Sequence, residues 1–301
     1  MQWRIFWRSI QRVARNSMKK LQILAPSPTY ISRYNGIRSS KREPIRSQLA
    51  DAELHAKVTA RYDEFESAVL TGMLECMTKD LACVARATPL RACYEGSTKG
   101  LAALKCDIKG AQPERALKFC PYCGTALPRT FDHYLPGASF PELSVHGLNL
   151  VPCCSSCNST KGEKWLNGVG SRQFLHFFSD EIPPGRFLNV TLNVSLDGRT
   201  VGARFSIVKP GNMPPALWKI VQSHFSGLNL LDRYLELGNG EIADMLASCN
   251  VYLQAGGANA RTFLRLQAAD WAEIFGENHW RAVLAATLCN HPSFDTWVGN
   301  A

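Results

Sequence analysis

The sequence predicts a mainly helical α+β protein built around a small central core that contains β structure. Three observations support this prediction. Long stretches on both sides of the centre repeat apolar residues at helical intervals. Two C-x-x-C pairs, at 120–123 and 154–157, lie close together in the middle, a spacing typical of a zinc-stabilised core. The stretch 187–208 alternates apolar and polar residues around an Asp-Gly turn and indicates a β-hairpin.

Shifts in composition divide the 301-residue chain into four expected segments. A basic N-terminal extension and linker covers 1–43, a helical flank 44–115, the cysteine-rich core 116–170, and a β-hairpin with a helical C-terminal region 171–301. The formal net charge of +9 favours a polyanionic partner such as nucleic acid. No internal repeat and no phosphate-binding P-loop is present, so the chain is not expected to be an ATPase itself.

The first forty-two residues contain no acidic side chain. Arginines at four-residue or three-residue spacing would share one face of a helix there, opposite an apolar face. Such a segment is typical of a helix that binds a membrane surface or DNA, of a mitochondrial-type address, or of an extension upstream of a start at Met18. Pro26-Ser27-Pro28 then indicates a linker.

Apolar periodicity predicts helices in the remaining flanks. Before the core these cover roughly 44–87 and 97–108. After the hairpin they cover roughly 215–225, 241–254, 261–275 and 279–289. Gly238-Asn239-Gly240 and Gly256-Gly257 are expected to break the helical pattern.

The two C-x-x-C pairs predict a closed set of four thiolates, which is the shell that structural zinc prefers. Its ligands would be Cys120, Cys123, Cys154 and Cys157, with Cys153 left to packing. A closed shell has no open position for water, so zinc is expected to stabilise the fold and not to take part in chemistry. The odd total of eleven cysteines and the lack of an apolar leader favour free, buried thiols elsewhere and a reducing, cytoplasmic location. No stretch is long and apolar enough for a membrane span.

Polar residues between and after the cysteine pairs predict a hydrolytic site. Asp132 and His133 lie between the pairs, Asn149 precedes the second pair, and Asn158 follows Cys157 directly. Hydrolysis of a phosphodiester needs a base that works near neutral pH, which histidine supplies, and a hard cation for the phosphoryl charge. One carboxylate and one amide oxygen make a weak magnesium site that a substrate phosphate would complete.

Together these residues resemble the HNH endonuclease family, also called the ββα-metal nucleases. The resemblance implies that His133 is the general base, that Asp132 and Asn158 hold a catalytic Mg²⁺ for which Mn²⁺ could substitute, and that Asn149 fixes the loop between base and metal. Asn158 stands where many members carry histidine, and an amide oxygen favours magnesium over softer ions. Thr160-Lys161-Gly162-Glu163 fits a capping box, so the helix of the ββα unit is expected to begin there or one turn earlier.

The strings around Phe131-Asp132-His133 and Asn149-Leu150-Val151-Pro152 resemble an anti-phage subgroup of this family, which includes the HNH subunits of Septu and retron systems. That resemblance implies a DNA-cutting effector that works beside a separate ABC-type ATPase. Gly137 departs from it, because the subgroup usually carries lysine there. Arg129, Lys161 and Lys164 are the expected contacts to nucleic-acid phosphates, against the alternative that such lysines are solvated surface groups.

Two other functions remain open from the sequence. In one, the cysteine pairs support a non-catalytic module that binds nucleic acid or protein. In the other, the same nuclease chemistry acts on RNA.

Overall fold

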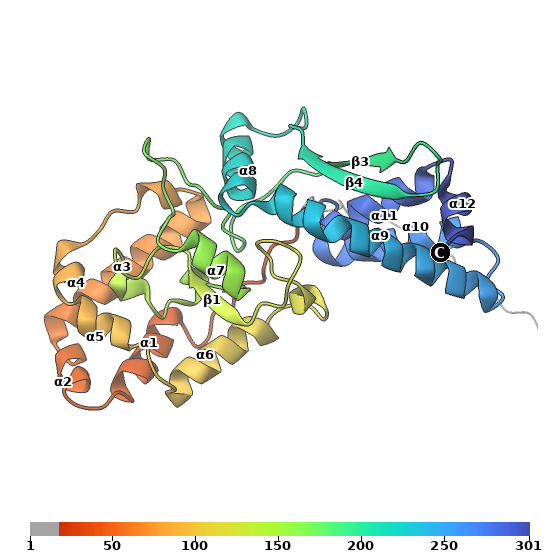
Figure 1. Cartoon of the computed structure of the whole chain (residues 1–301). Helices are drawn as coiled ribbons and strands as arrows, with labels where there is room; N and C mark the ends of the chain where they lie inside the picture. The colour runs from red at the N-terminus through yellow and green to blue at the C-terminus, as the bar shows by residue number, and fades with distance from the viewer. Residues whose placement is uncertain (1–17) are drawn as a thin grey trace, which may run out of the picture. The chain divides into compact units, whose positions relative to one another are not determined.

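The computed structural model of the chain describes residues 18–301, so the basic helix expected within residues 1–17 lies outside the described part. Within it the protein is a mixed α/β structure, mostly helical, with two small antiparallel sheets (Figure 1). The predicted mainly helical α+β class is therefore confirmed. The described chain forms two compact units. The cysteine unit comprises Lys19–Glu181 and Pro214–Tyr234, and the hairpin unit comprises Ile182–Met213 and Leu235–Ala301.

The cysteine unit contains the expected segments 44–115 and 116–170, but it also takes in 19–43 from the expected N-terminal linker and 171–181 and 214–234 from the expected C-terminal region. Its helices are α1 (Tyr30–Ser39), α2 (Ile45–Leu49), α3 (Ala52–Thr71), α4 (Leu81–Ala85), α5 (Ala87–Ala92), α6 (Lys99–Gly110), α7 (Ser155–Lys161) and α8 (Pro215–Gly227). Four single 3₁₀ turns join them: η1 (Leu74–Cys76), η2 (Ala116–Lys118), η3 (Pro141–Leu143) and η4 (Gly147–Asn149). Its sheet pairs β1 (Thr130–His133) with β2 (Leu150–Cys153).

Helix α3 shows how local sequence sets these elements. The Asp51 carboxylate caps its N-terminus by accepting from the backbone amides of Glu53 and Leu54 at 2.9 and 3.1 Å. Gly72 ends it in the left-handed conformation, φ +72°, where glycine is favoured. The buried side chains between these caps repeat at helical spacing and form one face: Leu54, Val58, Tyr62, Phe65 and Val69.

Helix α1 was not predicted, because the sequence around it reads as a linker. Its N-terminus is capped by Thr29, whose hydroxyl accepts from the Ser32 amide at 3.2 Å. Only Tyr34 and Ile37 of this helix are buried. Tertiary packing of these two side chains, and not a long apolar periodicity, therefore holds α1 in place.

The central core follows the order β1, β2, α7. Thr130 pairs with Cys153 and His133 with Leu150, so the two strands meet along their whole length. Helix α7 begins at Ser155, capped by Cys154, and ends at Lys161. Of the two expected helix starts the earlier one is close to the structure, and the start at Thr160 is wrong: Thr160 lies in the last turn, because the chain leaves the helix at Gly162.

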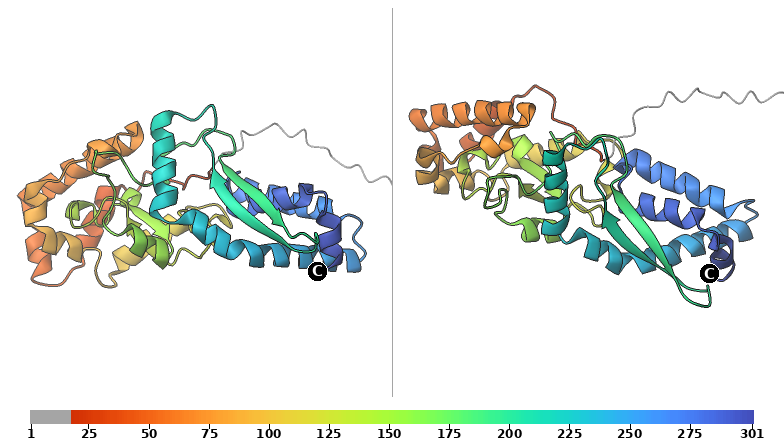
Figure 2. Two further views of the ribbon diagram at one scale, coloured as in Figure 1. Left: turned by 45° about the horizontal axis from the view of Figure 1, so that its top comes forward. Right: turned by 90° about the horizontal axis from the view of Figure 1, so that it is seen from above.

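The hairpin unit pairs β3 (Leu188–Val194) with β4 (Val201–Ile207), as the alternating pattern predicted. Leu188, Ala203 and Phe205 form its buried face, and β3 lies beside α11 (Trp280–Asn290) (Figure 2). The unit also contains the predicted α10 (Ala260–Phe275), the unpredicted short α12 (Phe294–Gly299) and most of α9, described below. Phe294 and Trp297 anchor α12 in the core.

Helix α9 (Leu230–Gln254) runs through Gly238-Asn239-Gly240, where a break was predicted. The Cβ of any other residue at Gly238 would lie 3.2 Å from a ring carbon of Phe205. The glycine therefore allows the hairpin to approach the helix, and the packing outweighs the low helix propensity. The expected break at Gly256-Gly257 is confirmed, since α9 ends just before it. Among residues 18–301 no helix combines the length and apolar character needed to cross a bilayer.

Candidate metal centre and adjoining cleft

Four cysteines come together at the end of the β1–β2 sheet. Cys120 and Cys123 precede β1, Cys154 lies between β2 and α7, and Cys157 lies in the first turn of α7. Their sulfur atoms all lie within 4.8 Å of one another, and all four residues are buried. The Cys123 and Cys154 sulfurs are 3.8 Å apart, which is about the ~3.8 Å edge of a tetrahedron with Zn–S bonds near 2.3 Å. The donor set and its size therefore fit a zinc ion.

The backbone of the first C-x-x-C pair is folded to point its sulfurs inward. The Gly124 amide donates to the Cys120 carbonyl at 2.7 Å, and Gly124 has φ +67°. A hydrogen bond from Cys120 lowers the pKa of Cys154 to about 6. The pKa of Cys120 and of Cys157 is raised instead, so the thiols of the metal-free cluster share their protons unequally, and a metal that binds the thiolate form would displace the remaining protons.

Arg233, in the first turn of α9, lies against the cysteine cluster. Its Nη1 donates to the Cys157 sulfur at 3.2 Å, and its Nη2 donates to the Thr125 hydroxyl at 3.1 Å. Four thiolates around Zn²⁺ leave a net charge of about −2, which a guanidinium in contact with a ligand sulfur offsets. Nothing in the sequence marked Arg233, because it lies 76 positions from Cys157.

Cys153 takes no part in the cluster, as predicted. It is buried, its sulfur lies 3.4 Å from the Thr130 hydroxyl, and it is absent from the four-sulfur group. The expectation that the remaining cysteines are buried is wrong for two of them, because Cys76 and Cys106 are exposed.

His133 ends β1 and pairs with Leu150, at the other end of the sheet from the cysteine cluster. Its Nε2 lies 2.9 Å from the Ser144 carbonyl oxygen, which can only accept, so Nε2 carries the hydrogen. Burial lowers the pKa of His133 below its ordinary value, partly offset by this bond. The imidazole is therefore neutral near pH 7, with its lone pair on Nδ1.

Asn149 holds the long loop between β1 and β2. Its Oδ1 accepts from the Leu135 amide at 2.7 Å, and its Nδ2 donates to the Leu135 and Leu143 carbonyls at 3.1 and 3.2 Å. The side chain is completely buried. Since Ser144 follows Leu143, Asn149 also fixes the segment whose carbonyl orients His133.

Asp132 and Lys161 form a buried ion pair that the sequence did not predict. The Lys161 Nζ lies 2.9 Å from Asp132 Oδ2 and also donates to the His133 carbonyl at 2.9 Å. The Tyr122 hydroxyl donates to Asp132 Oδ2 at 2.7 Å. The expected phosphate contact through Lys161 is wrong for this arrangement, because its side chain is 0% exposed.

Asn158 lies in α7 and is partly exposed. Its Nδ2 is 3.4 Å from both the Thr130 hydroxyl and the Phe131 carbonyl, which leaves Oδ1 as the atom available to a ligand. Asp132 is not accessible as Asn158 is, since the Asp132 carboxylate is 2% exposed and is bonded to Lys161 and Tyr122. The expected pairing of Asp132 and Asn158 around one magnesium ion is not assembled here.

A cleft of about 710 Å³ opens beside the metal centre. His133 and Asn158 both line it, together with Tyr94, Lys105, Cys106, Lys109, Arg129, Thr130 and Phe131. Of the three expected phosphate contacts only Arg129 is among them; Lys164 is exposed elsewhere on the unit. Sequence reasoning missed Lys105 and Lys109, although their spacing of four on a predicted helix would have placed them on one face.

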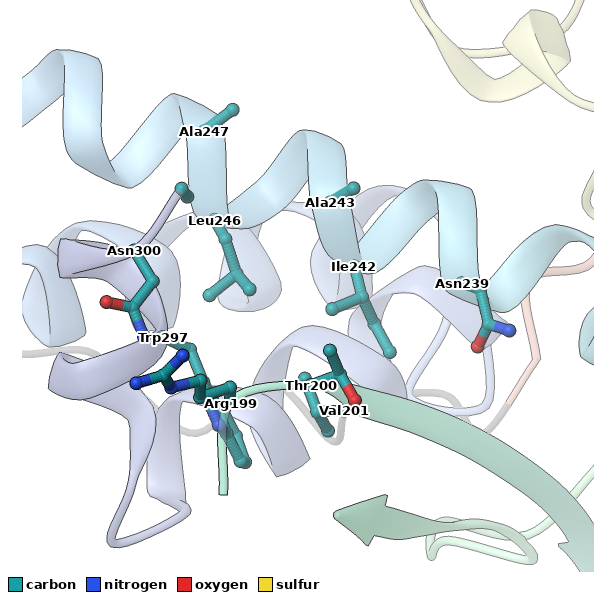
Figure 3. A pocket seen from close by; sticks show the side chains of 11 residues that line it. Arg199, Thr200, Val201, Asn239, Ile242, Ala243, Leu246, Ala247, Trp297 and Asn300 are labelled. Atoms are coloured by element: carbon teal, nitrogen blue, oxygen red, sulfur yellow. The ribbon is translucent and has the colours of Figure 1, made fainter. Parts of the chain in front are cut away.

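A second cavity, of about 370 Å³, lies within the hairpin unit between β4, α9 and α12 (Figure 3). Trp297 closes one side, and its indole nitrogen donates to the Gly198 carbonyl at 2.9 Å. The lining is mostly aliphatic and amide, and none of the described residues that line it is His, Cys, Asp or Glu. It offers no group for acid–base chemistry or metal binding.

Comparison with known proteins gives one relative. No protein-family model and no solved structure matches the chain. Protein ea31 of Escherichia phage lambda is 28% identical over 197 residues. That alignment covers 58% of this chain and 62% of the phage protein, so the chain spans less than two thirds of its relative.

Proposed function

We propose that this protein is a nuclease of the HNH type that hydrolyses phosphodiester bonds of DNA. The observation that supports this most is the state of His133. Its Nε2 hydrogen is held by the Ser144 carbonyl, and its pKa is lowered, so a neutral imidazole presents a lone pair on Nδ1. His133 lines one cleft with Asn158, which directly follows Cys157 of the cysteine cluster that fits zinc.

The order of elements also supports the proposal. His133 ends the first strand, Asn149 precedes the second, and Asn158 lies in the following helix directly after Cys157. This is the order of the three residues in the HNH resemblance. Asn149 makes the loop-fixing hydrogen bonds that its proposed role requires.

In the proposed reaction, His133 removes a proton from a water molecule and the water oxygen bonds to phosphorus. The bond from phosphorus to the leaving deoxyribose oxygen breaks, and that oxygen takes a proton from solvent. The products are a phosphate monoester and a hydroxyl. The cations in the cleft would offset the negative charge that grows on the phosphoryl oxygens.

The two expected metals fit this chain differently. Zinc fits the four cysteines and would hold β1, β2 and α7 together, with no open position for water. A magnesium ion shared by Asp132 and Asn158 does not fit, because both oxygens of Asp132 are engaged by Lys161 and Tyr122 beneath the cleft. No step of the proposed reaction is therefore assigned to magnesium.

The same ion pair favours a second function, in which the protein binds nucleic acid in this cleft without cutting it. An Asp132 neutralised by Lys161 cannot take a metal without losing that partner. His133 would then be a structural histidine on the wall of a binding groove.

A role in anti-phage defence, beside a separate ABC-type ATPase, is proposed on the sequence resemblance alone. It would make this chain the cutting subunit and the ATPase its regulator. Co-purification of the tagged chain from its native host, followed by identification of the bound proteins, tests this part of the proposal.

The cutting activity is tested by incubating the purified protein with supercoiled plasmid DNA and with RNA of similar length, with added magnesium or with EDTA. We expect nicked or linear plasmid from the wild type and none from His133→Ala. His55→Ala is the matched control, because this half-buried histidine lies on α3 away from the cleft. Binding without cutting by both wild type and His133→Ala supports the second function. Cutting of RNA only overturns DNA as the substrate.

A further inference from the structure

Three cations line the cleft, and no carboxylate in the described part of the chain is paired with them. Lys105 and Lys109 lie four residues apart on α6, and Arg129 precedes β1 (Figure 1). None of the three makes an ion pair within residues 18–301. The one acidic residue on α6, Asp107, is paired with Arg33 of α1 instead.

The α6 cations are held in place by aromatic rings. The Lys105 Nζ lies 4.0 Å from the Tyr94 ring centroid, and the Lys109 Nζ lies 5.3 Å from the Phe131 ring centroid. Cation–π contacts of this length are attractive and orient an ammonium group. Burial and the nearby Lys109 lower the pKa of Lys105. Two like charges are therefore kept close together, and a bound anion would relieve their repulsion.

Tyr94 also connects these cations to His133. The centroids of the Tyr94 and His133 rings are 4.4 Å apart, edge to face. The Lys105 Nζ lies over the same Tyr94 ring, 4.0 Å from its centroid. An anion held by Lys105 would consequently lie on the side of the cleft where Tyr94 and His133 are found. Leu101, Leu104 and Ile108 form the adjoining buried face of α6 and hold the helix in the unit.

We propose that Lys105, Lys109 and Arg129 form a binding site for the phosphate backbone of DNA, called here the α6 wall. It deepens the proposed function, on which it rests, by stating how the substrate is held. The α6 wall binds successive phosphates and places one of them next to His133. The acidic residue of α6, Asp107, does not compete with phosphate for these cations, because it is paired with Arg33.

The chemistry of the α6 wall also predicts what it does not recognise. Sequence-tolerant single-strand binding through bases uses exposed aromatic faces, and base-specific readout uses side chains that reach base edges. In the cleft Phe131 is 7% exposed and the Tyr94 ring is covered by Lys105. The α6 wall therefore binds phosphates and is indifferent to base sequence.

The first test measures binding of two unrelated fluorescent DNA duplexes by anisotropy, over a series of salt concentrations in EDTA. The variants are made on His133→Ala, so that cleavage plays no part. We expect Lys105→Gln/Lys109→Gln to weaken binding of both duplexes roughly tenfold and to reduce the salt slope by about two. Lys79→Gln/Lys99→Gln is the matched control, because it removes the same charge from exposed lysines outside the cleft.

If both double variants weaken DNA binding equally, the effect is one of net charge alone. That result overturns the α6 wall as a phosphate-binding site. Lys105→Arg/Lys109→Arg should restore both affinity and salt slope, since it keeps the charges. Failure of this rescue in a protein that melts like the parent overturns the assignment of these positions to phosphate binding. Tighter binding of an RNA duplex, with the same dependence on Lys105 and Lys109, overturns DNA as the ligand.

A second test uses the cysteines of this chain. Cys106 and Cys76 are both exposed, but only Cys106 lines the cleft. Saturating DNA should slow alkylation of Cys106 by iodoacetamide at least several-fold and leave Cys76 unchanged, as followed by peptide mass spectrometry. Equal rates at Cys106 with and without bound DNA overturn the α6 wall.

The failure of this inference and the failure of the nuclease proposal are distinguishable. DNA binding that depends on Lys105 and Lys109, in a wild type that never cuts, leaves the α6 wall standing and removes the nuclease. Cutting that His133→Ala abolishes, with unchanged DNA affinity in Lys105→Gln/Lys109→Gln, leaves the nuclease standing and removes the α6 wall.

Discussion

The ammonium of Lys161 lies 2.9 Å from the carboxylate of Asp132, and the two side chains are 0% and 2% exposed. The pair joins Lys161, the last residue of α7, to Asp132 in β1. The Lys161 Nζ also donates to the carbonyl oxygen of His133, the residue after Asp132. An interior ion pair of this kind holds its neighbours in one arrangement, because separating the charges without water is costly. Asp132 and Lys161 therefore position the backbone that carries His133.

Removing one member of this pair should destabilise the protein strongly. Asp132→Ala leaves an uncompensated buried cation, and Lys161→Met leaves a buried carboxylate, so each should lower the free energy of unfolding by roughly 3–5 kcal/mol. Asp132→Asn/Lys161→Met removes both charges and should recover much of that loss. Urea unfolding measures all three, with Glu43→Ala as the control from an exposed pair, which should leave the free energy of unfolding nearly unchanged. Single variants as stable as wild type would contradict the burial of this pair.

The same pair gives a test for magnesium. Asp132 is not free to bind an ion, so millimolar Mg²⁺ should raise the melting temperature no more than an equal ionic strength of NaCl does. A specific Mg²⁺ stabilisation, absent from both Asp132→Asn and Asn158→Ala, would instead restore the magnesium site expected from the sequence. Asn158→His would then shift the preference toward Mn²⁺.

Zinc should be present at about one ion per chain, as measured by elemental analysis. Cys120→Ser and Cys157→Ser should lose the metal and most of the folded protein, since the binding energy of a four-thiolate site is folding energy. Cys153→Ser is the matched control, because Cys153 is buried beside the cluster but is not in it. Arg233→Gln should keep the fold yet bind zinc roughly 10–100-fold more weakly. A folded, active Cys157→Ser protein without zinc would refute the metal centre.

If His133 is the base, cleavage should depend on pH with a defined sign. Burial lowers the pKa of His133, so the neutral, reactive form exists above a pKa that lies below ~6.5. The rate should therefore rise with pH through that value and be level at neutral pH, and His133→Ala should lose ~10²-fold or more. A rate that keeps rising above pH 7 would point to another base.

Two other histidines predict how stability depends on acid. Burial lowers the pKa of His176 and of His224 to about 4 each, compared with ~6.5 in the unfolded chain. Their stabilising effect is thus complete above pH ~6.5 and is lost as the pH falls toward 4, by roughly 3 kcal/mol for each histidine. His224→Gln should flatten the fall in unfolding free energy between pH 6.5 and 4. An unchanged slope would contradict a neutral, buried His224.

The sequence by itself determined the features that depend on short spacing. The four metal-binding cysteines follow from two C-x-x-C pairs, because two intervening residues fix how the sulfurs of one pair meet an ion. The β3–β4 hairpin follows from strict alternation around Asp197-Gly198, and helices α10 and α11 from their apolar periodicity. His133 and Asn149 could be marked as site residues because both lie within the pattern that the cysteines frame.

Tertiary structure alone decided features that depend on contacts between distant residues. Phe205 makes Gly238 a packing position within α9, where propensity predicted a break. Two buried side chains hold α1, which has too little periodicity to be recognised. Lys161 could be a surface lysine by sequence, but the end of α7 points its side chain at Asp132. Lys105 becomes a cleft residue only because α6 lies next to β1, since a charge acts on whatever the fold brings within a few ångströms of it.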